Sequence, residues 1–394
     1  MYPLRSCPVC QRRDAHLLHT IQYPAENDRI LPTEYRIVSC CGCGMVFDDF
    51  DAEEAAFARY YSSAEKYSLS HIVGSGEKTA EAAIRFQKIA DFIAPFITDK
   101  NALIADIGCG RGELLNELSR RGLKNLCAVD NSPKCIEYIK QHTNWKTIRS
   151  MLEELTEELN FDFIICSQIF EHLFSPPRAL QILSRILTPA GMIFIEVPNA
   201  RCYEKFIYKP YHYFDAEHIN HFSIEHLSLL LQTAGFEVIT SGEIENVLLS
   251  EIVYPDCYVL ARKTDNRQPP VNIETSSDYR EKISLYLKKS AEIADNRQQF
   301  LHAMDPARKY FLWGLGAYGL KLINSGAFDT WNIAGLIDID PSKHGKVIRG
   351  YRVYGPEILH DQENCGVCII SAIYEKQIRQ QLTAMGFSGD IASV

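Results

Sequence analysis

The chain has 394 residues, which is room for two to three domains of ordinary size. Its 46% hydrophobic and 23% charged residues are typical of a soluble globular protein, and the net charge of −9 argues against a general binder of nucleic acid or anionic membranes. We expect a cytoplasmic protein, because no apolar run is long enough to span a membrane and no apolar signal segment follows the first residues. The thirteen cysteines are an odd number in mostly apolar runs, which favours a reducing compartment over a disulfide scaffold.

Composition and hydrophobic patterning divide the chain into four blocks. Residues 1–62 are turn-rich and cysteine-rich, and residues 63–263 alternate strand-like and helical runs. Residues 264–304 begin with a linker that carries Pro269-Pro270 and continue as a surface helix. Residues 305–394 return to strand–turn–helix alternation. This order predicts a small N-terminal domain, a central α/β domain, a connecting helix and a small C-terminal α/β domain.

Two Cys-x-x-Cys pairs stand in the first block. Four thiolates from two such tight turns form a closed tetrahedral shell around Zn²⁺, which stabilises a fold and leaves no position for reacting water. The block is too short for a large core, and a structural zinc ion compensates for that. Cys41 is a spare thiol, while Cys365 and Cys368 lie in an apolar run that we assign to a buried strand. The predicted zinc ligands are Cys7, Cys10, Cys40 and Cys43.

Short apolar runs alternate with segments of helical period in the central block. This alternation predicts a mostly parallel, doubly wound sheet. The expected strands are Ala102–Ile107, Leu126–Val129, Phe161–Cys166 and Met192–Val197, and the expected helices are Gly112–Arg121, Pro133–Gln141 and Pro177–Leu187.

A glycine-rich turn joins the first of these strands to its helix. Gly108, Gly110 and Gly112 let the backbone approach a ligand closely, and Asp106 precedes them in the strand. A dinucleotide fingerprint would need glycine where Glu113 stands. The loop instead resembles motif I of class I S-adenosylmethionine (SAM) methyltransferases, whose cofactor carries a charged amino-acid end and a sulfonium but no pyrophosphate.

Three later segments extend this resemblance. Asp130 ends the next strand about twenty residues on, where a carboxylate accepts both hydroxyls of a ribose. The run Phe161–His172 resembles the family's fourth strand and its loop, and Leu187–Asn199 resembles its L-x-P-G-G…E-x-P-N strand with Ala190 in place of a glycine. The resemblance implies SAM binding at Asp106, Gly108, Gly110 and Asp130, adenine contacts from Met151 and Leu152, and a cofactor edge at Gln168 and His172.

The segment Tyr211–Ser223 follows at the carboxyl edge of the predicted sheet and is rich in histidines, acids and aromatic residues. Methyl transfer needs a nucleophile that has lost its proton and is held in line, and histidine is the usual base near neutral pH. A simpler role for the segment is to begin the helix after Ser223, in which His226 is structural.

The order of a four-cysteine block, a SAM domain and a C-terminal Rossmann-like domain resembles the sugar C-methyltransferases of deoxysugar biosynthesis. Their Y-H-E-H-x-x-x-F-S segment acts through its Glu-His pair on a keto sugar bound as a nucleotide diphosphate. Glu217, His218 and Phe222-Ser223 match it, whereas Asp215-Ala216 replaces Tyr-His and His221 stands at an aromatic position. The resemblance implies that His218 removes the proton beside the ketone and that Glu217 orients it or handles the enolate, with His221 as a further catalytic candidate.

The last block carries a glycine loop of its own. Gly314, Gly316 and Gly319 follow a short apolar strand, and Asp338 closes the next strand about twenty residues later. Two interpretations stay open: binding of NAD or another dinucleotide for redox work, or a redox-inert domain that holds the substrate's nucleotide. The second is favoured, because the block has room for one mononucleotide unit and carries no second catalytic cluster.

The sequence therefore predicts a SAM-dependent methyltransferase of a nucleotide-linked sugar, with structural zinc and no nucleic-acid or membrane partner. O- or N-methylation of another small metabolite by the same apparatus is the first alternative. The second is a zinc module that recruits the methyltransferase to a macromolecule. Against it, acids balance the cations between the two cysteine pairs, so no basic stripe is available; those cations are Arg12, Arg13, Arg29 and Arg36.

Overall fold

The computed structural model describes residues 4–22, 30–63, 80–156, 158–248, 252–264, 277–303, 305, 307–362, 364–371 and 373–394. The chain forms two compact units. The first comprises Met1–Ile21, Ile30–Phe206 and Tyr213–Tyr286, and the second comprises Gln22–Arg29, Ile207–His212 and Leu287–Val394. Among the described residues, no helix is both long enough and apolar enough to cross a membrane.

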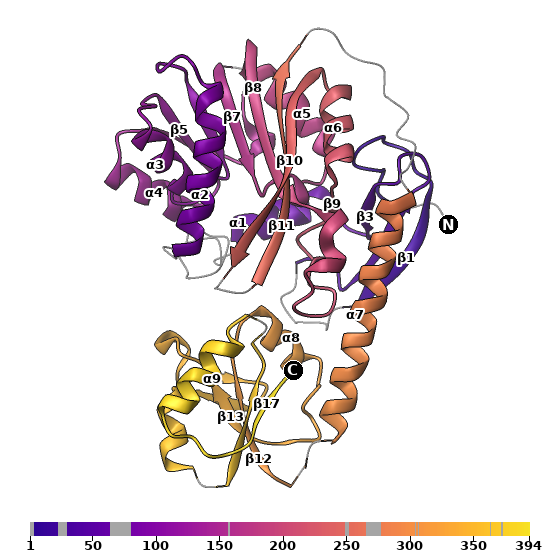
Figure 1. Ribbon diagram of the computed structural model, residues 1–394, viewed down its shortest axis with the longest axis vertical. Helices are drawn as coiled ribbons and strands as arrows, with labels where there is room; N and C mark the ends of the chain where they lie inside the picture. Colours follow the sequence, from indigo (N-terminus) through magenta and orange to yellow (C-terminus); the bar gives the residue numbers. More distant parts are fainter. Residues whose placement is uncertain are drawn as a thin grey trace. The chain divides into compact units, whose positions relative to one another are not determined.

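A seven-stranded sheet in the order β10-β11-β8-β7-β4-β5-β6 forms the centre of the first unit (Figure 1). The five strands from β8 to β6 are parallel, while β11 and β10 are added antiparallel at one edge. All four strands expected from the apolar runs are present, which confirms the predicted mostly parallel sheet. The strands are β4 (Ile104–Ile107), β5 (Leu126–Asp130), β6 (Lys146–Arg149), β7 (Phe161–Ser167), β8 (Leu187–Pro198), β10 (Phe236–Leu248) and β11 (Ile252–Lys263).

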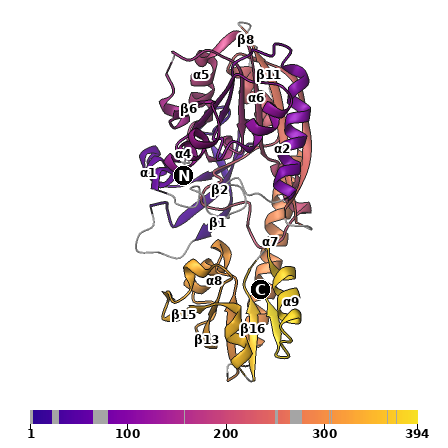
Figure 2. The ribbon, with the colours of Figure 1, turned by 90° about the vertical axis from the view of Figure 1, so that its left-hand side faces the viewer.

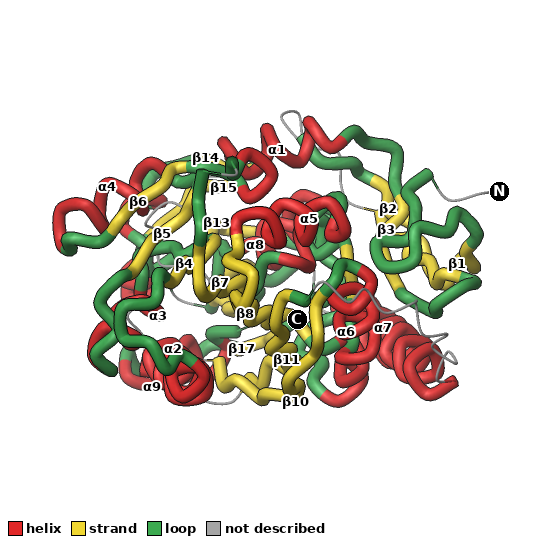
Figure 3. The backbone as a smooth tube through the Cα atoms, turned by 90° about the horizontal axis from the view of Figure 1, so that it is seen from above, coloured by secondary structure: helices red, strands yellow, loops and turns green. Residues whose placement is uncertain are grey.

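Helices cover both faces of this sheet (Figure 3). Along β7, Phe163 and Ile165 pack on the side of α2, α3 and α4, whereas Ile164 and Cys166 pack on the side of α5 and α6. Neighbouring residues of a strand point to opposite faces, so a strand covered on both faces is apolar throughout. The helices are α2 (Ala80–Ile93), α3 (Glu113–Arg120), α4 (Pro133–His142), α5 (Pro176–Ile186) and α6 (Ile224–Thr233).

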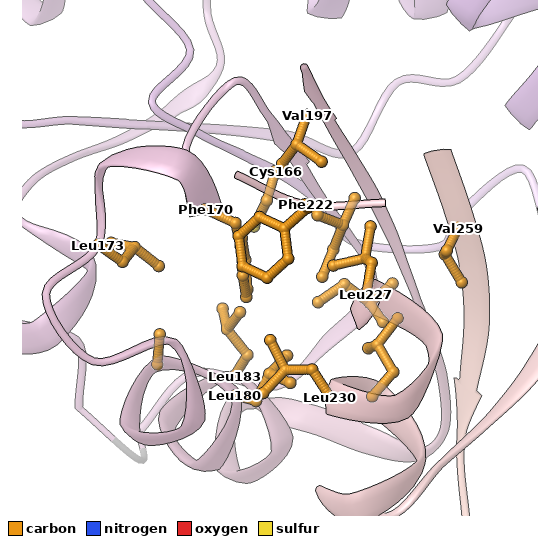
Figure 4. Packing of buried hydrophobic residues seen from close by; sticks show 14 of the residues in the cluster. Cys166, Phe170, Leu173, Leu180, Leu183, Val197, Phe222, Leu227, Leu230 and Val259 are labelled. Carbon is orange, nitrogen blue, oxygen red and sulfur yellow. The ribbon is translucent and has the colours of Figure 1, made fainter. Parts of the chain in front are cut away.

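The larger core lies between the sheet and the pair α5 and α6 (Figure 4). Phe170 and Phe222 are completely buried there, beside Leu180 and Leu183 of α5 and Leu227 of α6. Burying one such side chain stabilises the fold by about 1.5–3 kcal/mol. Both phenylalanines belong to loops at the carboxyl ends of strands, so this core also fixes the loops that carry the polar residues described below.

A four-stranded sheet, β1-β2-β3-β9, contains the N-terminal block. Its last strand, β9 (Asn220–His221), comes from far along the chain and pairs with β3. The buried Arg5 strengthens this link, because its guanidinium donates to the carbonyl oxygens of Asp48 and Ile219 at 2.7 and 3.1 Å. The N-terminal block therefore belongs to the first compact unit, although the sequence predicted a domain of its own. Its elements are β1 (Ala15–Gln22), β2 (Glu34–Cys40), β3 (Val46–Asp49) and α1 (Glu54–Ser63).

The second unit is built on a six-stranded sheet in the order β14-β15-β13-β12-β16-β17. Helices α8 and α9 cover its opposite faces (Figure 2), and Cys365 and Cys368 are buried in β16 as expected. The long helix α7 (Ser277–Ala303) matches the predicted surface helix. The other elements are β12 (Lys309–Trp313), α8 (Ala317–Asn324), β13 (Asn332–Ile337), β14 (Val347–Ile348), β15 (Tyr351–Tyr354), β16 (Cys365–Ile369), α9 (Glu375–Ala384) and β17 (Ile391–Ser393).

Candidate active site and metal centre

The two Cys-x-x-Cys pairs meet in space. The Sγ atoms of Cys7 and Cys43 are 3.5 Å apart, those of Cys10 and Cys40 are 3.4 Å apart, and all four lie within 4.8 Å of one another. Four thiolates at about 2.3 Å from one tetrahedral ion lie about 3.8 Å from each other, so the donor set fits Zn²⁺. Cys41 is exposed and stands outside the cluster.

Tight turns hold both pairs in this geometry. The carbonyl oxygen of Cys7 accepts from the N–H of Gln11, and that of Cys40 accepts from the N–H of Gly44, each at 3.0 Å. Gly44 has a φ of 77°, a conformation that favours glycine. The N–H of Gly42 points at the sulfur of Cys40 from 3.3 Å. An amide donor of this kind stabilises a thiolate, which is the form that ligates a metal.

The glycine loop of the central sheet has the backbone that its sequence requires. Gly108, Gly110 and Gly112 have φ angles of 73°, 55° and 80°, and α3 begins directly after them. A Cβ atom at Gly108 would lie 2.2 Å from the Cδ1 atom of Ile169. The loop is therefore packed against the segment 168–172, which brings two regions of predicted site residues together.

Asp130 holds this loop from the end of β5. One carboxylate oxygen accepts from the N–H of Gly110 at 2.9 Å, and the other accepts from the N–H of Ser132 at 2.7 Å. Burial raises the pKa of Asp130, and these two hydrogen bonds oppose the rise. The main-chain oxygen of Asp130 accepts from Ser150, which places Met151 and Leu152 beside it. Each carboxylate oxygen of Asp130 accepts one of these hydrogen bonds and has a second lone pair.

Asp106 lies beneath the loop and is only 4% exposed. Burial and the neighbouring charge of Asp130 raise its pKa to about 8, while Arg85 acts in the opposite direction. A positive charge bound beside Asp106 would favour its ionised form. The site is therefore suited to a cationic ligand end.

A network of buried charges continues from there across the sheet edge. Arg85 of α2 donates to Glu196 at 2.5 Å and to the hydroxyl of Ser167 at 2.7 Å. Asp256 accepts from the side chain of Gln168 at 2.9 Å, and burial followed by the charge of Glu196 raises its pKa to about 8. Of these residues, the sequence singled out only Gln168. Arg85 and Asp256 come from elements distant in sequence, and only the Glu of the E-x-P-N strand gave a local signal.

The segment Asp215–His218 forms a second cluster with His172. The rings of His172 and His218 stand edge to face with centroids 4.7 Å apart, and His172 Nδ1 is 3.0 Å from the carbonyl oxygen of Glu217. Tyr60 of α1 donates to the carboxylate of Glu217 at 2.6 Å, and Tyr61 lies 3.0 Å from His172 Nδ1. Burial and the neighbouring His218 lower the pKa of His172 to about 4. The two tyrosines were absent from the sequence prediction.

Glu171 is a buried acid next to His172 in the chain. It is 1% exposed, and among the described residues neither carboxylate oxygen has a hydrogen-bond partner. The Nε2 atom of His172 lies 3.7 Å from Glu171 Oε1. Burial raises the pKa of Glu171 well above its ordinary value, and the charges of Asp256 and Glu196 act in the same direction.

His221, the third predicted catalytic residue, lies elsewhere in its segment. It is completely buried on β9, and its Nε2 is 2.9 Å from Asp48 Oδ1 on β3. The ring also packs edge to face against Phe214, with centroids 4.5 Å apart. These contacts lie within the four-stranded sheet and beside it, so the side chain of His221 is engaged away from Glu217 and His218.

The C-terminal glycine loop is held by Asp338 at the end of β13. Asp338 accepts from the N–H of Leu315 at 3.1 Å, from the N–H of Asp340 at 2.9 Å and from Lys343 Nζ at 2.9 Å. A Cβ at Gly319 would lie 2.2 Å from the carbonyl oxygen of Gly314, so this position requires glycine for close packing. The predicted loop is present, with its acid paired to a lysine.

Two family models match the chain. Residues 82–241 match one described as a methyltransferase domain, and residues 306–391 match one described as C2185-like, N-terminal. Residues 82–241 are thus similar to a methyltransferase domain, and the first unit has the mixed α/β, Rossmann-like sheet that the sequence predicts.

Curated relatives resemble part of this domain. A ubiquinone biosynthesis O-methyltransferase of Xanthomonas oryzae pv. oryzae is 25% identical over 116 residues, which cover 28% of this chain and 48% of the relative. The protein of the same name from Coxiella burnetii is 28% identical over 123 residues, or 30% of this chain and 52% of the relative. The chain thus spans about half the length of these relatives.

Solved structures also align with the chain. The 1,6-didemethyltoxoflavin-N1-methyltransferase of Burkholderia thailandensis, with S-adenosylhomocysteine bound, has 20% identity and a TM-score of 0.43, covering 62% of this chain and 100% of its own. The magnesium protoporphyrin IX methyltransferase of Synechocystis, with SAM bound, has 17% identity and a TM-score of 0.39, covering 55% and 100%.

Proposed function

We propose that the chain is a SAM-dependent methyltransferase of a small polar metabolite. The contact of Gly108 with Ile169 carries the proposal, because it joins the glycine loop to the segment that contains His172. Bound SAM would supply a methyl group on a sulfonium that is ready for transfer. The protein then has to orient the acceptor, exclude water and remove its proton.

The residues around the loop fit this cofactor. Asp130 would accept the ribose hydroxyls with its remaining lone pairs, and Met151 and Leu152 would flank the adenine. Asp106 would face the cationic amino-acid end, which favours the charged form of its carboxyl. Gln168 and His172 would border the reacting end.

The acceptor that we propose first is a nucleotide-linked keto sugar methylated on carbon. The match of Glu217 and His218 to the sugar C-methyltransferase segment supports it. His218 would take the proton from the carbon beside the ketone, and the carbon would use the freed electron pair to bind the methyl group. Glu217, held by Tyr60, would orient this base. The C-terminal loop from Gly314 to Gly319 would bind a nucleotide.

O-methylation of another small metabolite is the second candidate, with N-methylation as its variant. The matched relatives carry the name ubiquinone biosynthesis O-methyltransferase, which supports an oxygen acceptor. Recruitment to a macromolecule by the zinc module has less support, because β9, which lies within the segment similar to a methyltransferase domain, pairs with β3 of that block.

We also propose that Cys7, Cys10, Cys40 and Cys43 hold a structural Zn²⁺. The four sulfurs converge, and a closed thiolate shell supplies folding free energy rather than a reaction step.

Incubation with SAM and a panel of nucleotide keto sugars, catechols and amines tests the function. Mass spectrometry should show one acceptor gaining a methyl group, and product analysis should show whether carbon, oxygen or nitrogen carries it. His218→Gln should abolish turnover while S-adenosylhomocysteine binds as before. Failure of the unmodified chain to bind S-adenosylhomocysteine would refute the proposal.

A further inference from the structure

Glu171 presents a physical problem that the proposed reaction does not solve. Its carboxylate is 1% exposed, and in the described part of the chain neither oxygen has a hydrogen-bond partner. Burying a charged or polar group without compensation costs several kcal/mol, so native proteins supply a partner. The charge of Arg85 acts on Glu171, but the guanidinium is hydrogen-bonded to Glu196 and Ser167. Among the described residues, no cation is therefore hydrogen-bonded to Glu171.

His172 is arranged in the way that metal-ligating histidines are. Its Nδ1 lies 3.0 Å from the carbonyl oxygen of Glu217 and 3.0 Å from the hydroxyl of Tyr61. In the tautomer whose Nδ1 donates to that carbonyl oxygen, Nε2 keeps its lone pair, and Nε2 lies 3.7 Å from Glu171 Oε1, beyond hydrogen-bond distance. A carbonyl that fixes the far nitrogen of an imidazole is the usual outer partner of a metal ligand.

His218 completes the group from the facing segment. Its Nδ1 is buried and has no hydrogen-bond partner among the described residues, and its ring meets that of His172 edge to face. Asp215 fixes the main chain here, because its Oδ1 accepts from the N–H groups of Glu217 and His218 at 2.9 Å each. One ligand atom from each of Glu171, His172 and His218 lies within 4.8 Å of the others.

We propose that Glu171, His172 and His218 bind a divalent transition-metal ion, separate from the four-cysteine zinc. Two imidazoles and a carboxylate suit Mn²⁺, Fe²⁺, Co²⁺ or Zn²⁺ better than Mg²⁺ or Ca²⁺. Ligand atoms at about 2.0–2.2 Å from one ion are about 3.0–3.6 Å from each other, so the three atoms, which now lie within 4.8 Å of one another, would move closer around the ion. Three protein ligands leave positions open for an acceptor oxygen.

This inference rests on the proposed function for its consequence. An acceptor hydroxyl bound to the ion loses its proton more easily, as metal-bound water does. The proton would pass to the carboxylate of Glu217, the oxygen lone pair would bond to the methyl carbon, and the electrons of the broken carbon–sulfur bond would go to sulfur. A His218 that ligates the ion cannot be the base, so an occupied site selects the O-methylation candidate.

Manganese binding tests the site directly. The protein with its cysteine site loaded with zinc is titrated with Mn²⁺ alone, and bound ion is measured by electron paramagnetic resonance and calorimetry. We expect stoichiometric binding that Glu171→Gln weakens by more than about 100-fold, beyond the loss typical of an outer partner. His218→Asn, at a half-buried position, should have the same effect. The matched control His142→Gln, on the surface of α4, should bind like the unmodified protein.

Absence of Mn²⁺ binding by the unmodified protein would overturn the site, as would equal binding by Glu171→Gln. S-adenosylhomocysteine affinity is measured on the same samples, and its retention by Glu171→Gln shows that the variant is folded. Mn²⁺ binding without S-adenosylhomocysteine binding would sustain the metal site and refute the proposed methyltransferase function, so the two failures are distinguishable.

Discussion

The two glycine loops of the molecule have the same arrangement of strand, glycines, helix and aspartate, but only the second has a lysine paired with its aspartate. In each, a strand runs into glycines, a helix follows, and an aspartate after the next strand accepts one main-chain N–H of the loop and one from the residue two positions after itself. Asp130 accepts from Gly110 and Ser132. Asp338 accepts from Leu315 and Asp340, and it is also paired with Lys343 at 2.9 Å.

The two aspartates have the same position in the fold, but only Asp338 is paired with a cation, so position alone does not determine what the acid does. The topology alone places the acid beside the glycines, because parallel neighbouring strands end at the same edge. Asp130 has no ion pair in the described part of the chain, which suits the proposed contact of its remaining lone pairs with ligand hydroxyl groups. Asp338 has its charge compensated within the protein, which suits a loop whose acid mainly stabilises the backbone.

The largest expected effect comes from removing the two acids in turn. Asp130→Ala should weaken S-adenosylhomocysteine binding by at least about 100-fold, since hydrogen bonds to a charged group contribute about 1.5–3 kcal/mol each. Asp338→Ala should leave that affinity unchanged. Calorimetry on both variants decides the matter, with the exposed Asp51→Ala as a control. Equal losses in both variants would contradict the contrast between the loops.

A second contrast concerns the glycines themselves. Gly108→Ala should destabilise the fold by about 2–4 kcal/mol, because position 108 has a φ of 73° and its Cβ would collide with Ile169. Gly316→Ala should change the free energy of unfolding little, since position 316 has a φ of −77° and open space around its Cβ. Chemical denaturation measures both. A larger loss at position 316 would show that the second loop is the more constrained.

The pH dependence of stability should distinguish the first loop further. The pKa of Asp106 in the folded protein, about 8, lies above its ordinary value of 3.8. The native state therefore binds the proton more tightly, and its stability falls as pH rises from about 4 to about 8, by at most about 1.4 kcal/mol per unit for this group. Asp106→Asn should flatten that slope in denaturation curves. An unchanged slope would exclude Asp106 as its source.

The smallest effect is expected at Lys343. Replacing it with methionine removes the ion pair of a partly exposed lysine and should lower the free energy of unfolding by about 1 kcal/mol or less. Thermal unfolding of Lys343→Met, compared with the surface variant Lys346→Met, would measure the loss. A loss of several kcal/mol would contradict this expectation, because it would show that the ion pair of Lys343 with Asp338 contributes far more stability than a partly exposed pair normally does.

The residues that could be predicted from the sequence are those whose geometry is determined by their near neighbours in the chain. The three glycines, Asp130 and the four cysteines follow from spacing, because a few neighbouring residues determine a turn. The sequence did not predict Tyr60, Arg85 and Asp256 as site residues, because each comes from an element that only tertiary packing brings to the site. The same holds for β9, a strand of two residues that carries no pattern of its own.

The pairing of β9 with β3 links the N-terminal block to the proposed reacting groups. The strand begins two residues after His218, and the tyrosines that hold Glu217 and His172 lie on α1, next to the cysteine block. Loss of the proposed zinc ion would therefore disturb the proposed reacting groups Glu217 and His172 without any change in the loop from Gly108 to Gly112. Removal of residues 1–62 would take Tyr60 and Tyr61 away from these groups, so the proposed catalytic function would depend on the N-terminal block.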